Sequence, residues 1–227
     1  MNTFVPTGEG MSYAVENYAK AIYALEHEGD GRVNNNALAG RLGVTAGSAS
    51  AMVKRLAELG LVEHVPYAGV ALSERGQRVA LEVMRRHRLL ELYLSEHLGV
   101  PWDRVHDEAE ALEHVLSKDL EARIAEKLGN PTHDPHGHPI PDADLVIHEP
   151  STVSLARMEP GACGRLVRVS DSDPDMLRYL AERAVRIGDR LEVLERQPFA
   201  GPLTVRFGED VLVLGGALVD AMHVTPE

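Results

Sequence analysis

The chain has 227 residues and carries 35 acidic against 23 basic side chains, which gives a formal net charge of −12 at pH 7. Its length allows one large domain or two to three small ones. The charge excludes a protein that coats nucleic acid non-specifically, but not one that binds DNA through a locally basic element. No apolar run reaches the roughly 18 residues of a membrane span, so we expect no membrane partner.

The N-terminal region predicts a helix followed by a helix-turn-helix. Residues 1–18 lack the basic and apolar stretches of a secretory signal, which favours a cytoplasmic protein. Residues 11–28 form an amphipathic pattern with Ser12 as the N-cap. Residues 34–44 predict a short helix that stops at a glycine, and residues 45–60 predict a second helix after a tight turn.

A hairpin follows these helices. Residues 61–65 and 70–72 predict two short strands, joined around Tyr67, Ala68 and Gly69. Helix, helix-turn-helix and hairpin, in this order, indicate a winged helix-turn-helix DNA-binding domain over residues 1–73. The alternative is an ordinary pair of helices in a globular core.

The second helix of the pair has the composition of a recognition helix. Small and hydroxyl side chains at its start let the helix N-terminus approach the major groove and contact phosphates and base edges. Two basic residues follow at positions suited to phosphate contact. The candidate DNA-binding residues are Thr45, Gly47, Ser48, Ser50, Ala51, Lys54 and Arg55.

Two further helices carry potential metal ligands. Residues 73–98 and 103–129 predict helices separated by a Gly-Val-Pro break. On each helix the histidines and glutamates share one face, because their spacing follows the helical period. These residues are His87 and Glu91 on the first helix and His106, Glu110, Glu113 and His114 on the second. Neither helix is long enough to bury its apolar face alone, so pairing with a second copy is expected.

The types of ligand restrict the choice of metal ion. A solvated charged face is the alternative for either helix alone, but two successive helices carry the same ligand types. Imidazole and carboxylate without thiolate suit Mn(II) or Fe(II), although Zn(II) would also bind tightly. The sequence therefore predicts a divalent-cation site beside a DNA-binding segment.

The composition and the apolar pattern change in the C-terminal half of the chain. Residues 130–145 are rich in Pro, Gly, His and Asp and predict a linker, in which His133, His136 and His138 are expected to be solvated, a weak metal site being the alternative. Residues 150–227 predict a small β domain, a barrel of about five short strands interrupted by one helix. The single cysteine, Cys163, is expected to be a small packed residue and fits a reducing cytosol. The expected fold is therefore mainly α with a small β domain.

The chain resembles the diphtheria toxin repressor and manganese transport regulator family of metal-dependent repressors. The resemblance is strongest in RRHRLLELYLSEHLGVPWDRVHDEAEALEHVLSKDLEARI and in PHGHPIP, and it covers nearly the whole chain. It implies a dimer with a winged-helix domain, a helical metal-binding and dimerisation domain over residues 74–142, and a C-terminal SH3-like barrel over residues 150–227. It also implies two neighbouring metal sites.

The resemblance also assigns ligands. His87, Glu91 and His106 match an ancillary site, and Glu110, Glu113, His114 and Asn17 match a primary site. The iron branch has Cys where this chain has Glu110, so Mn(II) is expected. Lys20 replaces an acidic ligand of the manganese branch, while Asp173, with Met176 nearby, matches a ligand from the SH3-like domain. Ala51 stands where the iron branch has Gln, so the operator need not be the iron-branch sequence.

The resemblance implies a transcription regulator that is loaded with Mn(II) and binds a palindromic double-stranded DNA operator as a homodimer. Repression of metal-uptake genes is expected. An Fe(II)-responsive repressor is the nearest alternative, and Zn(II), Cd(II) or Co(II) are expected to substitute in vitro. A metal buffer without DNA binding is an alternative from another class. The chain has no HExxH motif, nucleophile elbow or Gly-rich phosphate loop, so no enzyme is expected.

Overall fold

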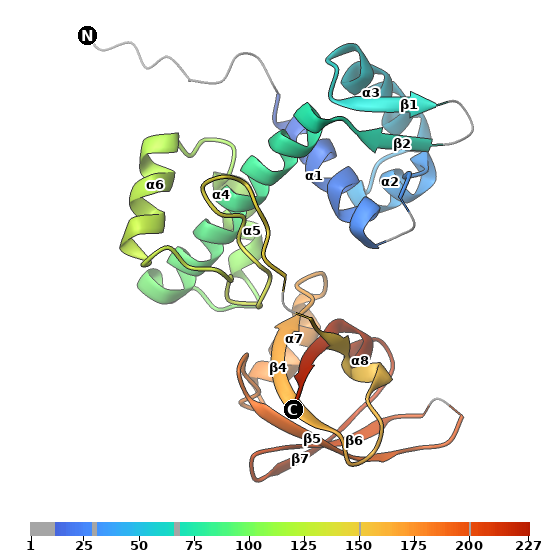
Figure 1. Ribbon diagram of the computed structural model, residues 1–227, viewed down its shortest axis with the longest axis vertical. Helices are drawn as coiled ribbons and strands as arrows, with labels where there is room; N and C mark the ends of the chain where they lie inside the picture. Colours follow the sequence, from blue (N-terminus) through green and yellow to red (C-terminus); the bar gives the residue numbers. More distant parts are fainter. Residues whose placement is uncertain (1–11, 29–30, 66–68, 150, 200) are drawn as a thin grey trace. The chain divides into compact units, whose positions relative to one another are not determined.

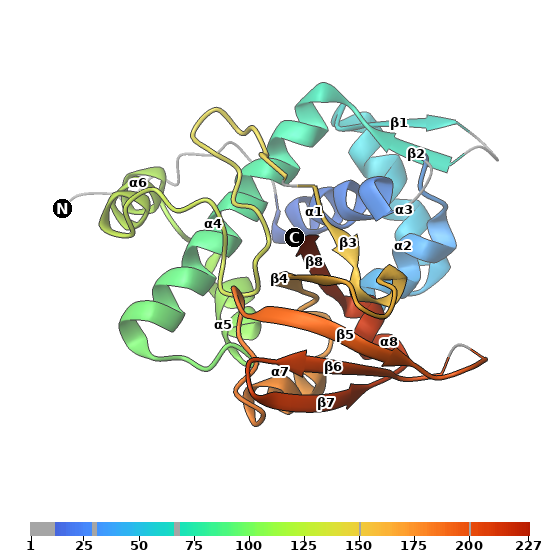
Figure 2. The ribbon, with the colours of Figure 1, turned by 60° about the horizontal axis from the view of Figure 1, so that its bottom comes forward.

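The computed structural model describes residues 12–28, 31–65, 69–149, 151–199 and 201–227. The ribbon is shown in Figure 1 and, turned by 60°, in Figure 2. The chain divides into two compact units. The first unit comprises Met1–His87, Leu112–Arg123 and Pro141–Val146, and the second comprises Arg88–Ala111, Ile124–Ile140 and Ile147–Glu227.

The first unit begins with the winged helix-turn-helix that the sequence predicts. Its elements are α1 (Tyr13–Glu28), α2 (Asn35–Leu42), α3 (Ala46–Glu58), β1 (Val62–Val65) and β2 (Gly69–Leu72). The two strands pair antiparallel, and a single bridge from Val33 to Val70 ties the segment after α1 to the hairpin. Of the predicted hairpin turn, Tyr67 and Ala68 lie outside the described residues.

Local chemistry fixes the ends of the two short helices. The Asn34 side chain accepts a hydrogen bond from the backbone N–H of Ala37 and so caps α2. Gly43 ends that helix with φ at 63°, a left-handed conformation that suits glycine. Thr45 then caps α3 by accepting from the N–H of Ser48.

One apolar core holds these elements together. It is lined by fully buried side chains from all three helices and the hairpin, which removes their apolar surface from water. Its members with no exposed surface include Ile22, Leu38, Ala49, Leu56, Leu61 and Val70. The amphipathic pattern of residues 11–28 is thus explained by the face of α1 that carries Ile22.

Three helices follow: α4 (Glu74–Leu98), α5 (Val105–Leu112) and α6 (Lys118–Lys127). The prediction of a single helix over residues 103–129 is wrong, because a turn separates α5 from α6. The Ser117 side chain accepts from the N–H of Leu120 and starts α6 as an N-cap, a better position for serine than a helix interior. Glu113 and His114 therefore lie in the turn after α5 rather than on a helix.

The C-terminal part of the second unit is a six-stranded antiparallel sheet in the order β3-β8-β4-β5-β6-β7 (Figure 2). Its elements are β3 (Val153–Ser154), a 3-10 turn (Leu155–Arg157), β4 (Cys163–Val169), α7 (Pro174–Ala181), β5 (Arg190–Arg196), β6 (Leu203–Phe207), β7 (Asp210–Leu214), α8 (Ala217–Ala221) and β8 (Met222–Pro226). The count exceeds the predicted five strands because Gly215, Gly216 and α8 split the last apolar run into β7 and β8. Cys163 is half-buried on β4 and forms no disulfide.

Candidate metal centres and DNA-binding helix

Four side chains from three segments meet in the second unit. Glu91 lies on α4 and is fully buried, and His106 lies on α5. His106 Nδ1 is 3.3 Å from Glu91 Oε1 and 3.3 Å from Asp171 Oδ2, and its Nε2 is 3.5 Å from Glu110 Oε2. The ligand atoms of Glu91, His106 and Asp171 lie within 4.8 Å of one another. One imidazole thus joins three carboxylates, a donor set that suits a divalent cation.

The charges in this cluster are strongly coupled. His106 donates a hydrogen bond to the Asp171 carboxylate, and this bond, with further bonds to Glu110 and Glu91, raises the pKa of His106 to about 12. Burial by itself would raise the pKa of Asp171, but the bond to His106 and the nearby His138 and His136 hold it well below its usual range. The carboxylates therefore favour positive charge at their centre, which a proton on His106 supplies.

Asp173 is not the acidic residue that reaches this cluster. Its side chain accepts from the N–H of Asp175 and caps α7. Asp171, two residues earlier, makes the contact to His106 instead. The segment VSDSDPDML contains three aspartates, so the sequence does not show which of them is the ligand. The position at which α7 begins makes Asp173 its N-cap and leaves Asp171 to contact His106. Met176, expected near this position, lies half-buried in the first turn of α7.

A second cluster lies in the first unit, around the fully buried carboxylate of Glu113. Lys20 on α1 donates from Nζ to Glu113 Oε1 at 2.6 Å, and His87 Nδ1 is 2.5 Å from Oε2. Burial by itself would raise the pKa of Glu113, but His87 and Lys20 outweigh it and lower the pKa. Glu113 is thus a buried carboxylate paired with an ammonium from α1 and an imidazole from α4.

His114 extends this cluster to another residue of α1. Its Nε2 is 3.3 Å from Glu113 Oε1, and its Nδ1 is 2.5 Å from Glu16 Oε2. The ring of Tyr13 stacks on the His114 ring. Sequence reasoning missed Glu16, although its place one turn before Lys20 on α1 was a signal that could have found it.

The position of Asn17 fits the assignment of an additional ligand. It lies on α1 between Glu16 and Lys20, and its side-chain oxygen is buried without a hydrogen-bond partner among the described residues. A buried amide oxygen without a partner carries an energetic cost that a cation would relieve. The carboxylate oxygens and imidazole nitrogens of the Glu113 cluster, together with this amide oxygen on the same helix as Glu16, are donor types that fit a divalent cation.

The sequence-predicted ligands thus divide between the two units. His87, Glu113, His114 and Asn17 lie in the first unit, and Glu91, His106 and Glu110 lie in the second. His87 precedes Glu91 by one turn on α4, but the contact described for it is to Glu113. Glu110, assigned to the primary set by resemblance, contacts His106 of the ancillary set.

The predicted DNA-binding residues form an exposed face. All seven, Thr45, Gly47, Ser48, Ser50, Ala51, Lys54 and Arg55, are exposed on α3 or at its N-cap. Two of the hydroxyls also have structural roles, because Thr45 caps the helix and Ser50 accepts from Asn35 Nδ2 at 2.9 Å. Arg55 forms only a loose, exposed ion pair with Glu58, at 3.6 Å, which leaves it able to turn towards a phosphate.

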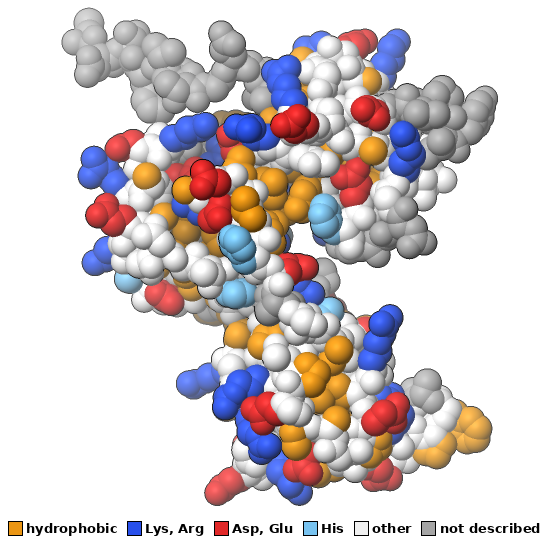
Figure 3. Space-filling view, viewed as in Figure 1, with side chains coloured by type: hydrophobic (Ala, Val, Ile, Leu, Met, Phe, Trp, Pro, Cys, Tyr) orange, Lys and Arg blue, Asp and Glu red, His pale blue; other side chains and the backbone are white. Residues whose placement is uncertain are grey.

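The surface of the β domain contrasts with this helix. Figure 3 shows basic and acidic side chains intermingled on the visible face of that domain. Ion pairs on strands of this domain include Arg206 with Glu192 and Arg190 with Glu227. Alternating charges of this kind do not form the basic patch that binds nucleic acid.

The histidine-rich segment is not the solvated linker that composition predicts. His136 has no exposed surface and Asp134 is 5% exposed, so both side chains are buried. Asp134 Oδ1 accepts from the N–H groups of His136 and His138, which folds the segment into a tight loop. Burial lowers the pKa of His138, but Asp134 and Asp171 outweigh it and raise the pKa. Pro and Gly here shape a packed loop rather than a flexible one.

Three family models match consecutive parts of the chain. Residues 11–70 match the iron-dependent repressor N-terminal DNA-binding domain, residues 73–142 match the iron-dependent repressor metal-binding and dimerisation domain, and residues 153–226 match the FeoA domain. The iron-dependent repressor IdeR of Mycobacterium tuberculosis strain H37Rv is 40% identical over 221 residues, covering 92% of this chain and 95% of that protein.

The chain belongs to the iron-dependent repressor family. The diphtheria toxin repressor of Corynebacterium efficiens is 31% identical over 217 residues, covering 91% of this repressor and 90% of that protein. A solved manganese-dependent transcriptional repressor in complex with manganese is 42% identical, with a TM-score of 0.88, and covers 94% of this repressor and 100% of that chain. The manganese regulator SloR is 32% identical, with a TM-score of 0.79, over 96% of this repressor and 100% of that chain.

Membership confirms the predicted class and architecture of this repressor. Family members are metal-dependent, DNA-binding transcriptional repressors rather than enzymes, and they dimerise. The predicted order of winged helix, helical domain and SH3-like domain is confirmed as well. Among the described residues, no helix is long and apolar enough to cross a membrane.

Proposed function

We propose that this repressor responds to Mn(II) and, loaded with it, binds a palindromic operator as a homodimer to repress metal-uptake genes. The assignment of Mn(II) rests on the types of ligand atom that the two clusters offer. The second-unit cluster offers imidazole and carboxylate ligands without thiolate. The Glu113 cluster also offers imidazole and carboxylate, with the buried amide oxygen of Asn17 on the neighbouring helix α1. Such ligands favour Mn(II) over metals that prefer thiolate. The likeness to a repressor solved with manganese supports the same choice.

The cluster around Glu113 is the proposed primary site. Glu113, His114 and Asn17 would hold the cation, with Glu16 as an additional donor from α1. When bound, the cation supplies positive charge between carboxylates that otherwise repel. Lys20 supplies that charge in the metal-free chain, because its ammonium already contacts Glu113 Oε1. Lys20 must therefore give up this contact for Glu113 to bind a metal through both oxygens.

The contacts between α1 and the turn after α5 explain how metal binding could control DNA binding. Glu16 contacts His114 and Lys20 contacts Glu113, so side chains of the DNA-binding domain already contact the dimerisation segment. A ligand that binds this arrangement more tightly than others shifts the population towards it. The coupling is reciprocal, so operator DNA should in turn tighten metal binding.

The test is a parallel titration of operator binding by Mn(II), Fe(II) and Zn(II), with a chelator as reference. We expect Mn(II) to tighten wild-type binding at least tenfold, about 1.4 kcal/mol. Glu113→Gln should abolish this gain, because it removes the charge of a buried ligand. Glu108→Gln changes an exposed glutamate on α5 outside both clusters and should leave it intact. Equal affinity with chelator and with Mn(II) would contradict the switch.

Fe(II) is the second candidate metal. It is favoured by the 40% identity to iron-dependent repressors named IdeR, and the ligand types accept it equally well. The same titration decides between the two: a stronger response to Fe(II) than to Mn(II), under anaerobic conditions, would replace manganese by iron in the proposal.

A further inference from the structure

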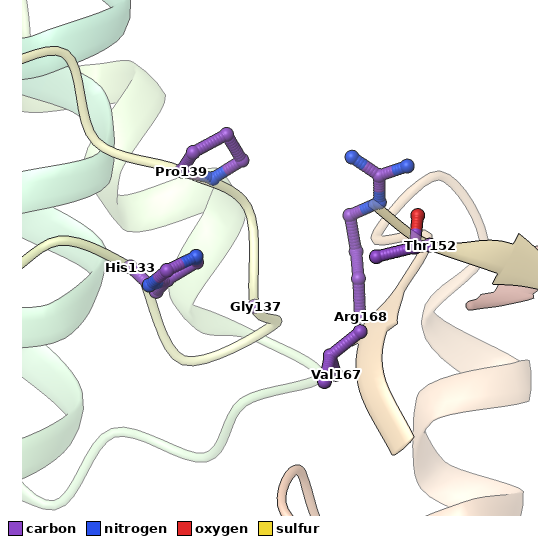
Figure 4. Close-up of a pocket in the computed structure, with 6 residues that line it drawn as sticks. All are labelled: His133, Gly137, Pro139, Thr152, Val167 and Arg168. Atoms are coloured by element: carbon purple, nitrogen blue, oxygen red, sulfur yellow. The ribbon is translucent and has the colours of Figure 1, made fainter. Parts of the chain in front are cut away.

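The loop formed by residues 133–140, here called the histidine loop, is fixed to the β domain. The N–H of Val169 donates to the carbonyl of His136 at 2.9 Å. Gly137 has φ at 85°, and a Cβ there would lie 1.9 Å from the carbonyl oxygen of Val167, so only glycine allows this approach. Figure 4 shows His133, Gly137 and Pro139 facing Thr152, Val167 and Arg168 across a small pocket. The loop is thus built to hold its side chains in place.

The His136 ring has a defined tautomer. Its Nε2 lies 2.7 Å from the backbone carbonyl oxygen of Trp102, which can only accept. Nε2 therefore carries the hydrogen and donates it, so Nδ1 of the neutral ring presents a lone pair. A carbonyl that orients one ring nitrogen in this way is the usual partner of a metal-binding histidine.

The lone pair of Nδ1 faces the second-unit cluster. His136 is fully buried, and Nδ1 has no hydrogen-bond partner among the described residues. It lies 3.8 Å from Oε1 of Glu91, which is also fully buried. A proton on Nδ1 would not bridge this gap, because 3.8 Å is too long for a hydrogen bond. The lone pair of His136 Nδ1 thus faces a carboxylate oxygen that already pairs with His106. Burial of this nitrogen without a donor or a cation costs free energy.

The separation suits a shared cation. Imidazole nitrogen and carboxylate oxygen lie about 2.0–2.2 Å from Zn(II), so two such ligands of one ion are about 3–4 Å apart. Glu91 Oε1 is also 3.3 Å from His106 Nδ1, and the ligand atoms of Glu91, His106 and Asp171 lie within 4.8 Å of one another. The same carboxylate oxygen therefore faces nitrogens from α5 and from the histidine loop.

We propose that His136, through Nδ1, is a ligand of the divalent cation bound by Glu91, His106 and Asp171. This role rests on the proposed function, because it adds a ligand to one of its two sites. The histidine loop would then supply a nitrogen ligand to the same carboxylate oxygen that His106 of α5 contacts. A water molecule that donates to both Nδ1 and Glu91 is the competing occupant.

The experiment measures Mn(II) binding to the full chain by calorimetry and Co(II) binding by quenching of Trp102, the chain's single tryptophan. Its ring stacks on the His136 ring at 6.0 Å between centroids, so it reports on this site. His136→Gln should weaken the second-unit site at least tenfold, as expected for the loss of a ligand. His133→Gln, on the same loop, should leave it unchanged, and Glu91→Gln should remove it.

The outcomes separate the two proposals. A wild-type chain that binds no cation in the second unit overturns the proposed site and the role of His136 together. If wild type and His136→Gln bind with the same dissociation constant while Glu91→Gln fails to bind, only the role of His136 is overturned. If His136→Gln does not fold, anomalous scattering from Zn(II)-soaked wild-type crystals decides. A Zn(II) peak about 2.1 Å from Nδ1 supports ligation, and a peak beyond about 3 Å shows that His136 is not a ligand.

Discussion

At the scale of single residues, the two clusters show that a buried charge is held by its immediate neighbours. Glu113 is balanced by Lys20 and His87, and Asp171 by His106. Sequence spacing identified His106 and Glu113 because they are seven positions apart, about two turns of a helix, and so share one face of the expected helix. It could not identify Asp171, because its partner His106 lies 65 positions away along the chain. Glu16 shares a helix face with Lys20, but its contact with the distant His114 is decided only by the tertiary structure.

Gly76 gives a prediction on packing. A Cβ at this position in α4 would lie 1.9 Å from the carbonyl oxygen of Leu61, so Gly76→Ala must displace backbone. We expect a loss of about 1–3 kcal/mol in the free energy of unfolding. Gly40→Ala, in α2 with nothing within 4 Å of the added Cβ, should instead stabilise by about 0.5–1 kcal/mol. Urea denaturation measures both, and similar effects of the two changes would contradict the contact.

At the scale of elements, α3 combines a structural and a functional face. Its buried side, with Ala49, Val53 and Leu56, packs into the core, and its exposed side carries the candidate DNA contacts. The alternation follows from the helical period, which is why the sequence could predict it. The break between α5 and α6 was not predicted, because the local apolar pattern continues through it while the Ser117 cap interrupts the helix.

Arg55 tests the DNA-binding face. Arg55→Ala should weaken binding to all DNA sequences alike and lower the salt dependence of binding by about one unit of slope, because it removes one phosphate contact. Arg123→Ala is the control, since Arg123 on α6 is another exposed arginine paired with an acidic neighbour on its own helix. Binding assays over a salt series measure the slopes. A change of sequence preference in Arg55→Ala would indicate base contact instead.

At the scale of the whole molecule, dimerisation should bury apolar side chains that one chain leaves in water. The region matched to the metal-binding and dimerisation domain exposes Leu112, Val115 and Leu120, each by 39% or more. Burial of such side chains is the main favourable contribution to association. These three residues are therefore the expected contact with the second copy.

Val115→Asp combined with Leu120→Glu should shift this repressor from dimer to monomer, since buried carboxylates without partners disfavour an interface. Phe199→Ser, at a fully exposed position in the β domain, is the matched control and should leave the dimer intact. Sedimentation velocity gives the oligomeric state of each variant. A double variant that remains dimeric at micromolar concentration would place the interface elsewhere.

The sequence by itself determined what depends on local periods and caps. Spacing along a single element was enough to predict the winged helix-turn-helix and the short strands of the C-terminal domain. It was also enough to predict the potential ligands on α4 and α5. Tertiary structure decided what depends on partners distant in the chain. It brought Lys20 to Glu113, Asp171 rather than Asp173 to His106, and the buried His136 to Glu91. Spacing shows which side chains share a face, but the identity of the opposing residue depends on how the segments pack.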